Sequence, residues 1–203
     1  KNSSKNFSTT GRYFPPVSFL PGCVVLLPNQ FQHNPDEKNP TPSRCRDVYR
    51  HVGYSAMMQK DETIANQLRE RHREVFTNYT KAHDGEILQY FGDGTLSIYP
   101  SAAAAVECAV DIQKELKKDP PVALRIGIHT GDISYSEEDV FGDGVNVASR
   151  IESLCVPGGI FISGKVYDDI KNHTRLRAVP LGKFSLKNIH DQIEIYSVSN
   201  QGI

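Results

Sequence analysis

The most informative stretch of this chain is residues 86–99, which read EILQYFGDGTLSIY. Two apolar segments, 86–91 and 95–99, flank the tripeptide Gly92-Asp93-Gly94, and this pattern is typical of a β-hairpin with a tight turn. The turn holds the carboxylate of Asp93 at its tip. Taken alone, such an acid is usually only a turn residue, so its meaning depends on the rest of the chain.

A second motif, residues 139–150, reads DVFGDGVNVASR and joins a glycine-rich turn to a predicted helix. Within that helix Asn146 and Arg150 are four residues apart, which places them on one face. A metal-binding acid, together with an amide and a guanidinium on a shared helical face, is suited to a nucleoside triphosphate. The alternative interpretation is a surface amide and a solvated charge.

The pattern after residue 53 alternates between helices and strands. Helices are predicted where apolar residues recur at helical spacing, and strands where they alternate or follow glycine turns. The predicted helices cover residues 62–80, 101–118, 143–154 and a short stretch ending at 170; the predicted strands cover 86–91, 95–99, 123–129, 131–135, 160–163, 176–181 and 193–198. This order predicts an α+β fold, a ferredoxin-like βαββαβ sandwich with C-terminal additions.

Residues 1–47 differ in composition from the rest of the chain. They contain 7 of the 12 prolines, many Asn and Ser residues, and no sustained period of 2 or 3.6 residues. Such a composition is typical of a disordered segment. One folded domain is therefore predicted over residues 48–199.

The overall composition argues against several kinds of partner. The net charge is −1, so there is no broad basic surface for nucleic acid, and no run approaches the roughly 18 apolar residues of a membrane span. The four cysteines lie far apart without a CxxC pair, which indicates neither zinc nor disulfides and predicts a cytoplasmic location. Cys108, Cys155 and His129 are predicted to be structural.

Several short motifs together resemble the catalytic domain of class III nucleotidyl cyclases, the adenylyl and guanylyl cyclase family. In family order they are residues 52–55 (VGYS), 91–94 (FGDG), 124–132 (LRIGIHTGD), 139–150, 157–160 (PGGI) and 186–188 (LKN). Each motif is weak alone, but the ordered set is specific, and the shorter bacterial members are the most similar. The resemblance implies the class III cyclase fold, cyclisation of ATP or GTP with Mg²⁺ or Mn²⁺, and a site completed only in a head-to-tail homodimer.

The resemblance also implies roles for individual residues. Asp93 matches one of two aspartates that hold two divalent ions, as in two-metal phosphoryl transfer generally. Asn146 matches the residue that orients the ribose, and Arg150 the one that stabilises charge on the α-phosphate in the transition state. Lys187 matches the lysine that binds the triphosphate, although a loop lysine is normally only solvated.

Two further positions imply the choice of base. Asp139 matches the aspartate that accepts a hydrogen bond from the exocyclic amine of adenine. Its usual partner is lysine in adenylyl cyclases and glutamate in guanylyl cyclases, whereas this chain has Gln89, whose amide could serve either purine edge. Asp139 favours ATP, and a guanylate cyclase is the alternative. A diguanylate cyclase is disfavoured because its Gly-Gly-Asp/Glu-Glu-Phe motif is absent.

The chain departs from the family at the first metal aspartate. That residue should lie three positions before Gly53, in a strand reading Phe-Thr-Asp-Ile, but this chain reads Val48-Tyr49-Arg50-His51. A guanidinium at Arg50 would repel the cation. Taken literally, the sequence would make a regulatory pseudocyclase that binds nucleotide without turning it over.

A shift of reading frame explains this departure. Val48 to His51 can be encoded as GTT TAC CGA CAT, and skipping the first base gives TTT ACC GAC AT, which encodes Phe-Thr-Asp and the start of Ile. In the same frame, residues 43–47 permit Leu-Ala-Ala-Val-Met, the apolar strand that the family has there. The hypothesis is a one-base frameshift near His51, which would make the preceding residues an out-of-frame segment.

Overall fold

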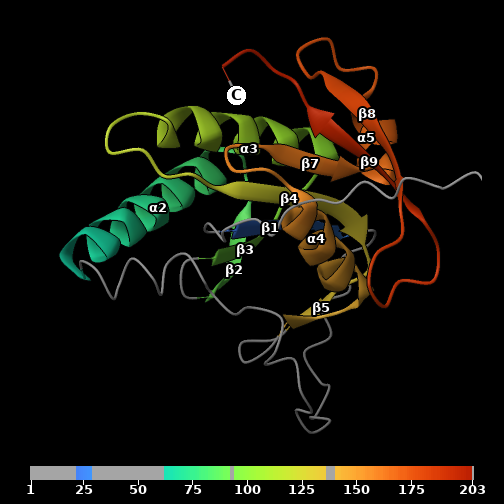
Figure 1. The fold of residues 1–203 in the computed structure, drawn as a ribbon, viewed down its shortest axis with the longest axis horizontal. Helices are drawn as coiled ribbons and strands as arrows, with labels where there is room; N and C mark the ends of the chain where they lie inside the picture. Colours follow the sequence, from blue (N-terminus) through green and yellow to red (C-terminus); the bar gives the residue numbers. More distant parts are fainter. Residues whose placement is uncertain (1–21, 29–61, 92–93, 136–139, 203) are drawn as a thin grey trace, which may run out of the picture.

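The computed structural model describes residues 22–28, 62–91, 94–135 and 140–202 of the chain (Figure 1). Its strands are β1 (Gly22–Pro28), β2 (Glu86–Phe91), β3 (Gly94–Ile98), β4 (Arg125–Gly131), β5 (Ser134–Tyr135), β6 (Val140–Phe141), β7 (Ile160–Ser163), β8 (Ala178–Phe184) and β9 (Ile193–Val198). Its helices are α2 (Glu62–Ala82), α3 (Ala102–Leu116), α4 (Asp143–Leu154) and α5 (Gly164–Ile170). Seven strands form one sheet in the order β2-β3-β1-β4-β7-β9-β8, and β5 pairs with β6.

The first half of this order, β2-β3-β1-β4, has the strand order of the predicted ferredoxin-like βαββαβ unit, but β1 runs opposite to the first strand of such a unit, which is antiparallel to both of its neighbours. β1 lies between β3 and β4 and is parallel to both, while β2 and β3 form an antiparallel hairpin. β7, β9 and β8 extend the sheet beyond β4 as the predicted C-terminal additions. The α+β fold class is therefore confirmed.

The origin of the central strand differs from the sequence-based expectation. β1 comes from Gly22–Pro28, within the segment whose composition predicts disorder. The residues between its ends, Cys-Val-Val-Leu-Leu, form a continuous apolar run, which is typical of a parallel strand with neighbours on both sides. The other residues of 1–47 lie outside the described part of the chain, so the boundary near residue 47 stays a prediction.

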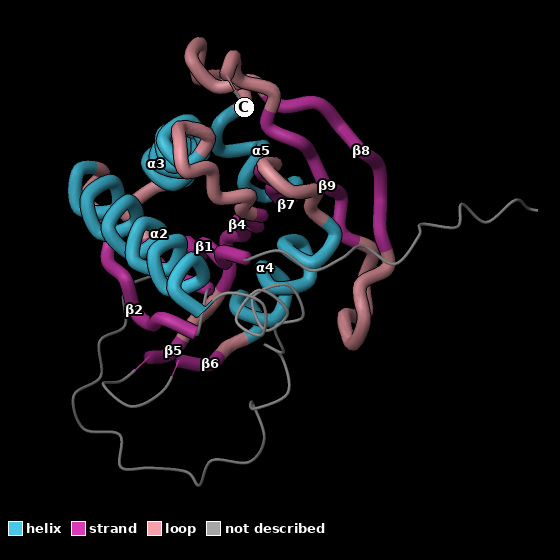
Figure 2. Tube along the Cα trace, turned by 60° about the vertical axis from the view of Figure 1, so that its left-hand side comes forward, coloured by secondary structure: helices cyan, strands magenta, loops and turns pink. Residues whose placement is uncertain are grey.

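The two faces of the sheet carry different helices. α2, α3 and α5 cover one face, where they share a large apolar core with β4 and β7. α4 covers the opposite face, where it packs against β3 in one cluster and against β7 and β9 in another (Figure 2). α4 is thus the only helix on its side among the described elements.

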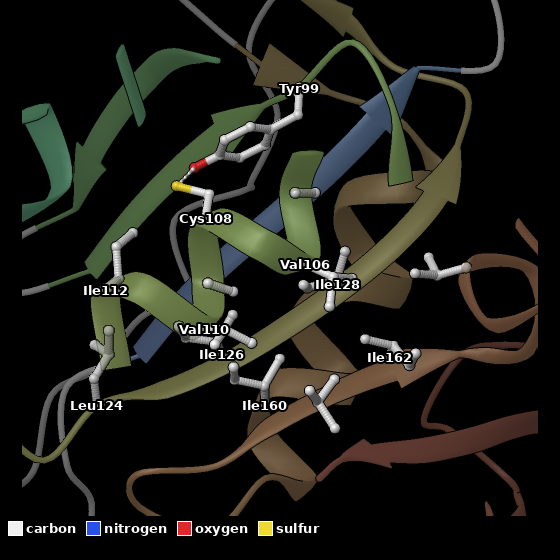
Figure 3. Close-up of a cluster of buried hydrophobic side chains, with 14 of the residues drawn as sticks. Tyr99, Val106, Cys108, Val110, Ile112, Leu124, Ile126, Ile128, Ile160 and Ile162 are labelled. Carbon is white, nitrogen blue, oxygen red and sulfur yellow. Dashed lines mark hydrogen bonds between the residues drawn. The ribbon is translucent and has the colours of Figure 1, made fainter. Parts of the chain in front are cut away.

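The larger core shows why these segments fold as predicted. Ile126 and Ile128 alternate along β4 toward α3, whose buried side chains include Val106 and Cys108 (Figure 3). Ser101 caps α3, because its side-chain oxygen accepts a hydrogen bond from the backbone N–H of Ala104 at 3.1 Å. Figure 3 also shows the hydrogen bond of 3.2 Å between the Tyr99 hydroxyl and Cys108 Sγ.

Candidate functional site

α4 lies unusually close to β4 because glycines line the contact. A Cβ atom at Gly127 would lie 2.4 Å from the backbone nitrogen of Glu152 and 2.6 Å from the Ala148 carbonyl oxygen. A Cβ atom at Gly131 would lie 2.8 Å from Cα of Gly144. Any side chain at these positions of β4 would therefore push the helix away from the sheet.

The entry into α4 also requires glycine. Gly142 is the N-cap with φ +145°, and a Cβ there would lie 2.5 Å from the Asp132 carbonyl oxygen. Asp143 is the first residue of the helix, as the predicted range 143–154 has it, and the cap before it is a glycine, since only a glycine fits this backbone conformation. The carboxylate of Asp143 lies in the first turn, where negative charge is favourable.

The two predicted catalytic residues lie on the face of α4 that points away from β4. Asn146 is exposed and Arg150 is half-buried, whereas Val147, Ala148 and Ile151 between and beside them are buried. The spacing of four residues thus produces the shared face that the sequence predicts. An amide and a guanidinium are available there to a ligand that approaches α4 from outside.

A β-bulge brings Gln89 to the same side of the sheet as α4. The register of β2 against β3 shifts between Ile87 and Gln89, so Gln89 pairs with Leu96. Leu96 belongs to the apolar cluster that includes Val145 of α4, and directly paired residues of an antiparallel hairpin share a face. Simple alternation from Ile87, which packs on the α2 side, would have placed Gln89 on the opposite face.

Lys187 lies near the flank of α4 opposite to Gln89, because the preceding residue, Leu186, packs against that flank. Leu186 is buried in the cluster that contains Val147 and Ile151 of α4. The backbone N–H of Ile189 bonds to the Leu186 carbonyl at 3.1 Å, which closes a tight turn with exposed Lys187 at its start. Figure 2 shows α4 between β2 and the loop that joins β8 to β9.

The remaining predicted site residues lie outside the described part of the chain. In the sequence, Asp93 lies between the end of β2 at Phe91 and the start of β3 at Gly94, and Asp139 precedes β6. Arg50 is likewise outside. Within residues 22–28, 62–91, 94–135 and 140–202, no group of three or more His, Cys, Asp or Glu residues is arranged to hold a metal ion.

The donor set for the implied metal ions fits only in part. A carboxylate at Asp93 suits the hard cations Mg²⁺ and Mn²⁺, but the chain as written has the Arg50 guanidinium where the second carboxylate is expected. The described strand beside β3 and β4 is Gly22–Pro28, which carries no acid either.

The sequence motifs do not predict the ion pair that lies between α4 and β4. Arg125 Nη2 of β4 lies 2.8 Å from Glu152 Oε1 of α4, and both side chains are 9% exposed. The sequence does contain a signal, which is a charged residue at a position expected to be buried in each element. Arg125 precedes the buried residues Ile126 and Ile128 of its strand, and Glu152 follows buried Val145 and Ala148 by seven and four positions, which is helical spacing.

The buried histidines and cysteines are structural, as predicted for His129, Cys108 and Cys155. His129 Nδ1 is hydrogen-bonded to Ser163 Oγ at 2.9 Å, and burial lowers its pKa to about 4. Burial raises the pKa of Cys108 to about 11 and that of Cys155 to about 12, so both thiols stay protonated near neutral pH. His72 was not anticipated; its Nε2 lies 3.3 Å from Thr95 Oγ1.

These histidines predict that acid destabilises the fold. Burial, with a smaller contribution from Arg73 for His72 and from Lys165 for His129, lowers both pKa values from 6.5 to about 4. Between these values the unfolded chain binds more protons, so stability falls as pH falls. The expected loss is about 2 kcal/mol per histidine between about pH 7.5 and pH 5, measured by urea unfolding.

Histidine variants separate this effect from the titration of carboxylates. His72→Gln and His129→Gln should each remove about half of the pH dependence in that range, whereas His190→Gln, at an exposed side chain, should leave it unchanged. An unfolding free energy that is flat between about pH 7.5 and pH 5 would contradict the prediction.

Comparison with known proteins places the chain among nucleotide cyclases. Residues 63–200 match the family model described as the adenylate and guanylate cyclase catalytic domain. A putative adenylate cyclase 3 of Rhizobium meliloti (strain 1021) is 38% identical over 156 residues, which are 73% of this chain and 27% of that protein. The chain spans about a quarter of the length of such curated relatives, with 26% for the next, adenylate cyclase 1 of the same organism.

Solved structures agree with this result. The adenylate/guanylate cyclase/hydrolase from Silicibacter pomeroyi superposes with a TM-score of 0.64 at 31% identity, covering 73% of this chain and 91% of that one. The catalytic core of a rhodopsin-guanylyl cyclase with converted specificity, solved in complex with ATPαS, has a TM-score of 0.57 at 27% identity and covers 66% of this chain and 80% of its own. No helix among the described residues is long and apolar enough to span a membrane.

Proposed function

The chain belongs to the adenylate and guanylate cyclase catalytic domain family, and we propose that it is an adenylate cyclase, which converts ATP to 3′,5′-cyclic AMP and pyrophosphate. The observation that carries the proposal is the outer face of α4, where exposed Asn146 and half-buried Arg150 lie between the elements that carry Gln89 and Lys187. A neutral donor, a guanidinium and an ammonium around one helix are suited to a ribose and its triphosphate.

The proposed reaction forms one bond and breaks another at the same phosphorus. The ribose 3′-oxygen loses its proton and attacks the α-phosphorus, and the bond from this phosphorus to the bridging oxygen of pyrophosphate breaks. Asn146 orients the ribose for attack, and Arg150 stabilises the negative charge that grows on the α-phosphate oxygens. Lys187 binds the triphosphate as a point charge.

A divalent cation, Mg²⁺ or Mn²⁺, held in part by Asp93, would lower the pKa of the 3′-hydroxyl and neutralise the triphosphate. Its full donor set requires the reading frame that encodes Phe-Thr-Asp-Ile. We use the name frame-restored chain for the protein in which residues 43–51 read Leu-Ala-Ala-Val-Met-Phe-Thr-Asp-Ile. The remainder of the proposed site lies in segments unaffected by this change.

Base selection in the proposal rests on Asp139 and Gln89. The Asp139 carboxylate would accept a hydrogen bond from the exocyclic amine of adenine. Guanine has a carbonyl oxygen at the same position, which cannot donate a hydrogen bond to a carboxylate. Gln89, which the bulge in β2 places on the α4 side of the sheet, would present its amide to the same purine edge. The curated relatives named adenylate cyclase lend support to an adenine nucleotide as substrate. The proposed assembly is a head-to-tail homodimer with shared sites.

Product analysis tests this function. The chain and its frame-restored form are incubated with Mn²⁺ and either ATP or GTP, and cyclic nucleotides are quantified by chromatography. We expect cyclic AMP, formed with a kcat/KM at least about tenfold above that for cyclic GMP, because a mismatched carboxylate leaves a buried polar group unpaired.

Two other outcomes identify the competing functions. Faster turnover of GTP would make the protein a guanylate cyclase and would overturn the role of Asp139. Nucleotide binding without product from either form would favour a regulatory binding module, which is the function that Arg50 in the sequence as written supports.

A further inference from the structure

Two opposite charges are buried together between α4 and β4. Arg125 Nη2 and Glu152 Oε1 are 2.8 Å apart, and each side chain is 9% exposed. Burying a pair of charges costs desolvation energy, so such a pair rarely stabilises a fold more than apolar side chains of the same volume. Conformational specificity is a better explanation of this pair than stability.

Glu152 lies on the side of α4 opposite to the proposed ligand face. It follows Arg150 by two positions and Asn146 by six, which corresponds to about 200° and about 240° around an α-helix. A rotation of α4 that moved Glu152 relative to Arg125 would turn the outer face through the same angle. The contact at Glu152 therefore controls the direction in which Asn146 and Arg150 point.

The other contacts beneath α4 fix its distance from the sheet more than its rotation. Gly127 permits the close approach of the helix backbone at Ala148 and Glu152. The apolar contacts of Val145 and Ile151 on the two flanks of the helix are non-directional, so they tolerate small rotations. The ion pair instead joins one position of α4 to one position of β4, because a rotation that separated the two buried charges would leave each without its compensating charge.

We infer that the Arg125–Glu152 pair is a positioning device that fixes the rotation of α4 on β4 and thereby aims Asn146 and Arg150 at the substrate. The inference rests on the proposed function for its consequence in turnover, but not for its structural part. Neither residue touches the substrate in this scheme. Both act through the two residues that do.

The test replaces the pair by apolar side chains of similar length, in the double variant Arg125→Met with Glu152→Met. Because this leaves no unpaired buried charge, the variant should fold with a Tm within a few degrees of the parent. Its crystal structure, superposed on β4 and β7, should show the Cα atoms of Asn146 and Arg150 displaced by about 1 Å. In the frame-restored background kcat should fall about 10- to 100-fold, with KM within about threefold, because small misplacements of this size are that costly.

The matched control removes a carboxylate from an ion pair of equal length at the surface. Asp168 Oδ1 lies 2.8 Å from Lys171 Nζ, and both side chains are largely exposed, so Asp168→Asn should change neither the position of α4 nor kcat. The single variant Glu152→Gln should lower Tm, since it leaves Arg125 charged and buried. This variant would show that the pair is formed in solution.

The outcomes separate this inference from the proposed function. An undisplaced α4 in the double variant overturns the inference, whatever the turnover. A displaced α4 with unchanged kcat overturns the link to catalysis. If the parent makes no cyclic nucleotide, the proposed function fails, and the position of α4 alone still decides whether the pair orients the helix.

Discussion

Restoring the frame of residues 43–51 is expected to raise the rate of ATP cyclisation by about 100-fold or more. The change puts a carboxylate where the chain as written has the guanidinium of Arg50. A divalent cation at this site would be held by both carboxylates, and an arginine in place of one of them would oppose its binding. The measurement is the initial rate of cyclic AMP formation at saturating Mn²⁺ and ATP.

The control carries the same rewritten segment with Asn in place of the new Asp. It keeps the restored strand but lacks the carboxylate, so its rate should stay near that of the chain as written. Equal rates for the Asp and Asn forms would show that the strand, not the metal ligand, matters. Genomic sequence whose second frame cannot encode Phe-Thr-Asp would refute the frameshift directly.

The restored segment is also expected to replace β1 in the sheet. In the chain as written, residues 29–61 connect β1 to α2, whereas the restored strand would need only residues 52–61. A shorter connection costs less closure entropy, and long irregular connections are uncommon in compact domains. Removing residues 1–42 should therefore destabilise the chain as written but leave the frame-restored chain folded.

The sequence predicts most of the fold because local signals delimit most elements. The predicted bounds of α4 and β7 agree with the structure, since glycine turns at Gly142 and at Gly158-Gly159 end the preceding segments. β1 could not be predicted in the same way. Its apolar run is short and lies in a segment rich in proline, so only pairing with the distant β3 and β4 defines it as a strand.

The candidate site is predictable only as a set of side chains, not as an arrangement. Helical spacing places Asn146 and Arg150 on one face, and the structure agrees. The face on which Gln89 lies depends on a one-residue bulge in β2, which alternation does not reveal. The contact between Arg125 and Glu152 joins a strand and a helix through tertiary packing, and no local pattern encodes it.

Arg150→Ala in the frame-restored chain is expected to lower kcat by about 100- to 1,000-fold, with little change in KM. The guanidinium is proposed to act on charge that develops only in the transition state, so its loss should spare ground-state binding. Arg177→Ala, at an exposed arginine outside the proposed site, should leave both constants unchanged. A rise in KM of the same size with unchanged kcat would contradict this prediction. It would show that Arg150 binds the nucleotide equally strongly in the ground state and in the transition state.

Mixing two inactive variants then tests whether each site is shared between chains. If the proposed head-to-tail dimer brings Asp93 of one copy to Arg150 of the other, a mixed dimer of Asp93→Asn and Arg150→Ala chains would have one site with both defects and one with neither. Equal mixing should recover about a quarter of the parent activity, since half of the dimers are mixed and half of their sites are intact. If both residues served the same site from one chain, every site would keep a defect. The mixture would then stay as inactive as its components.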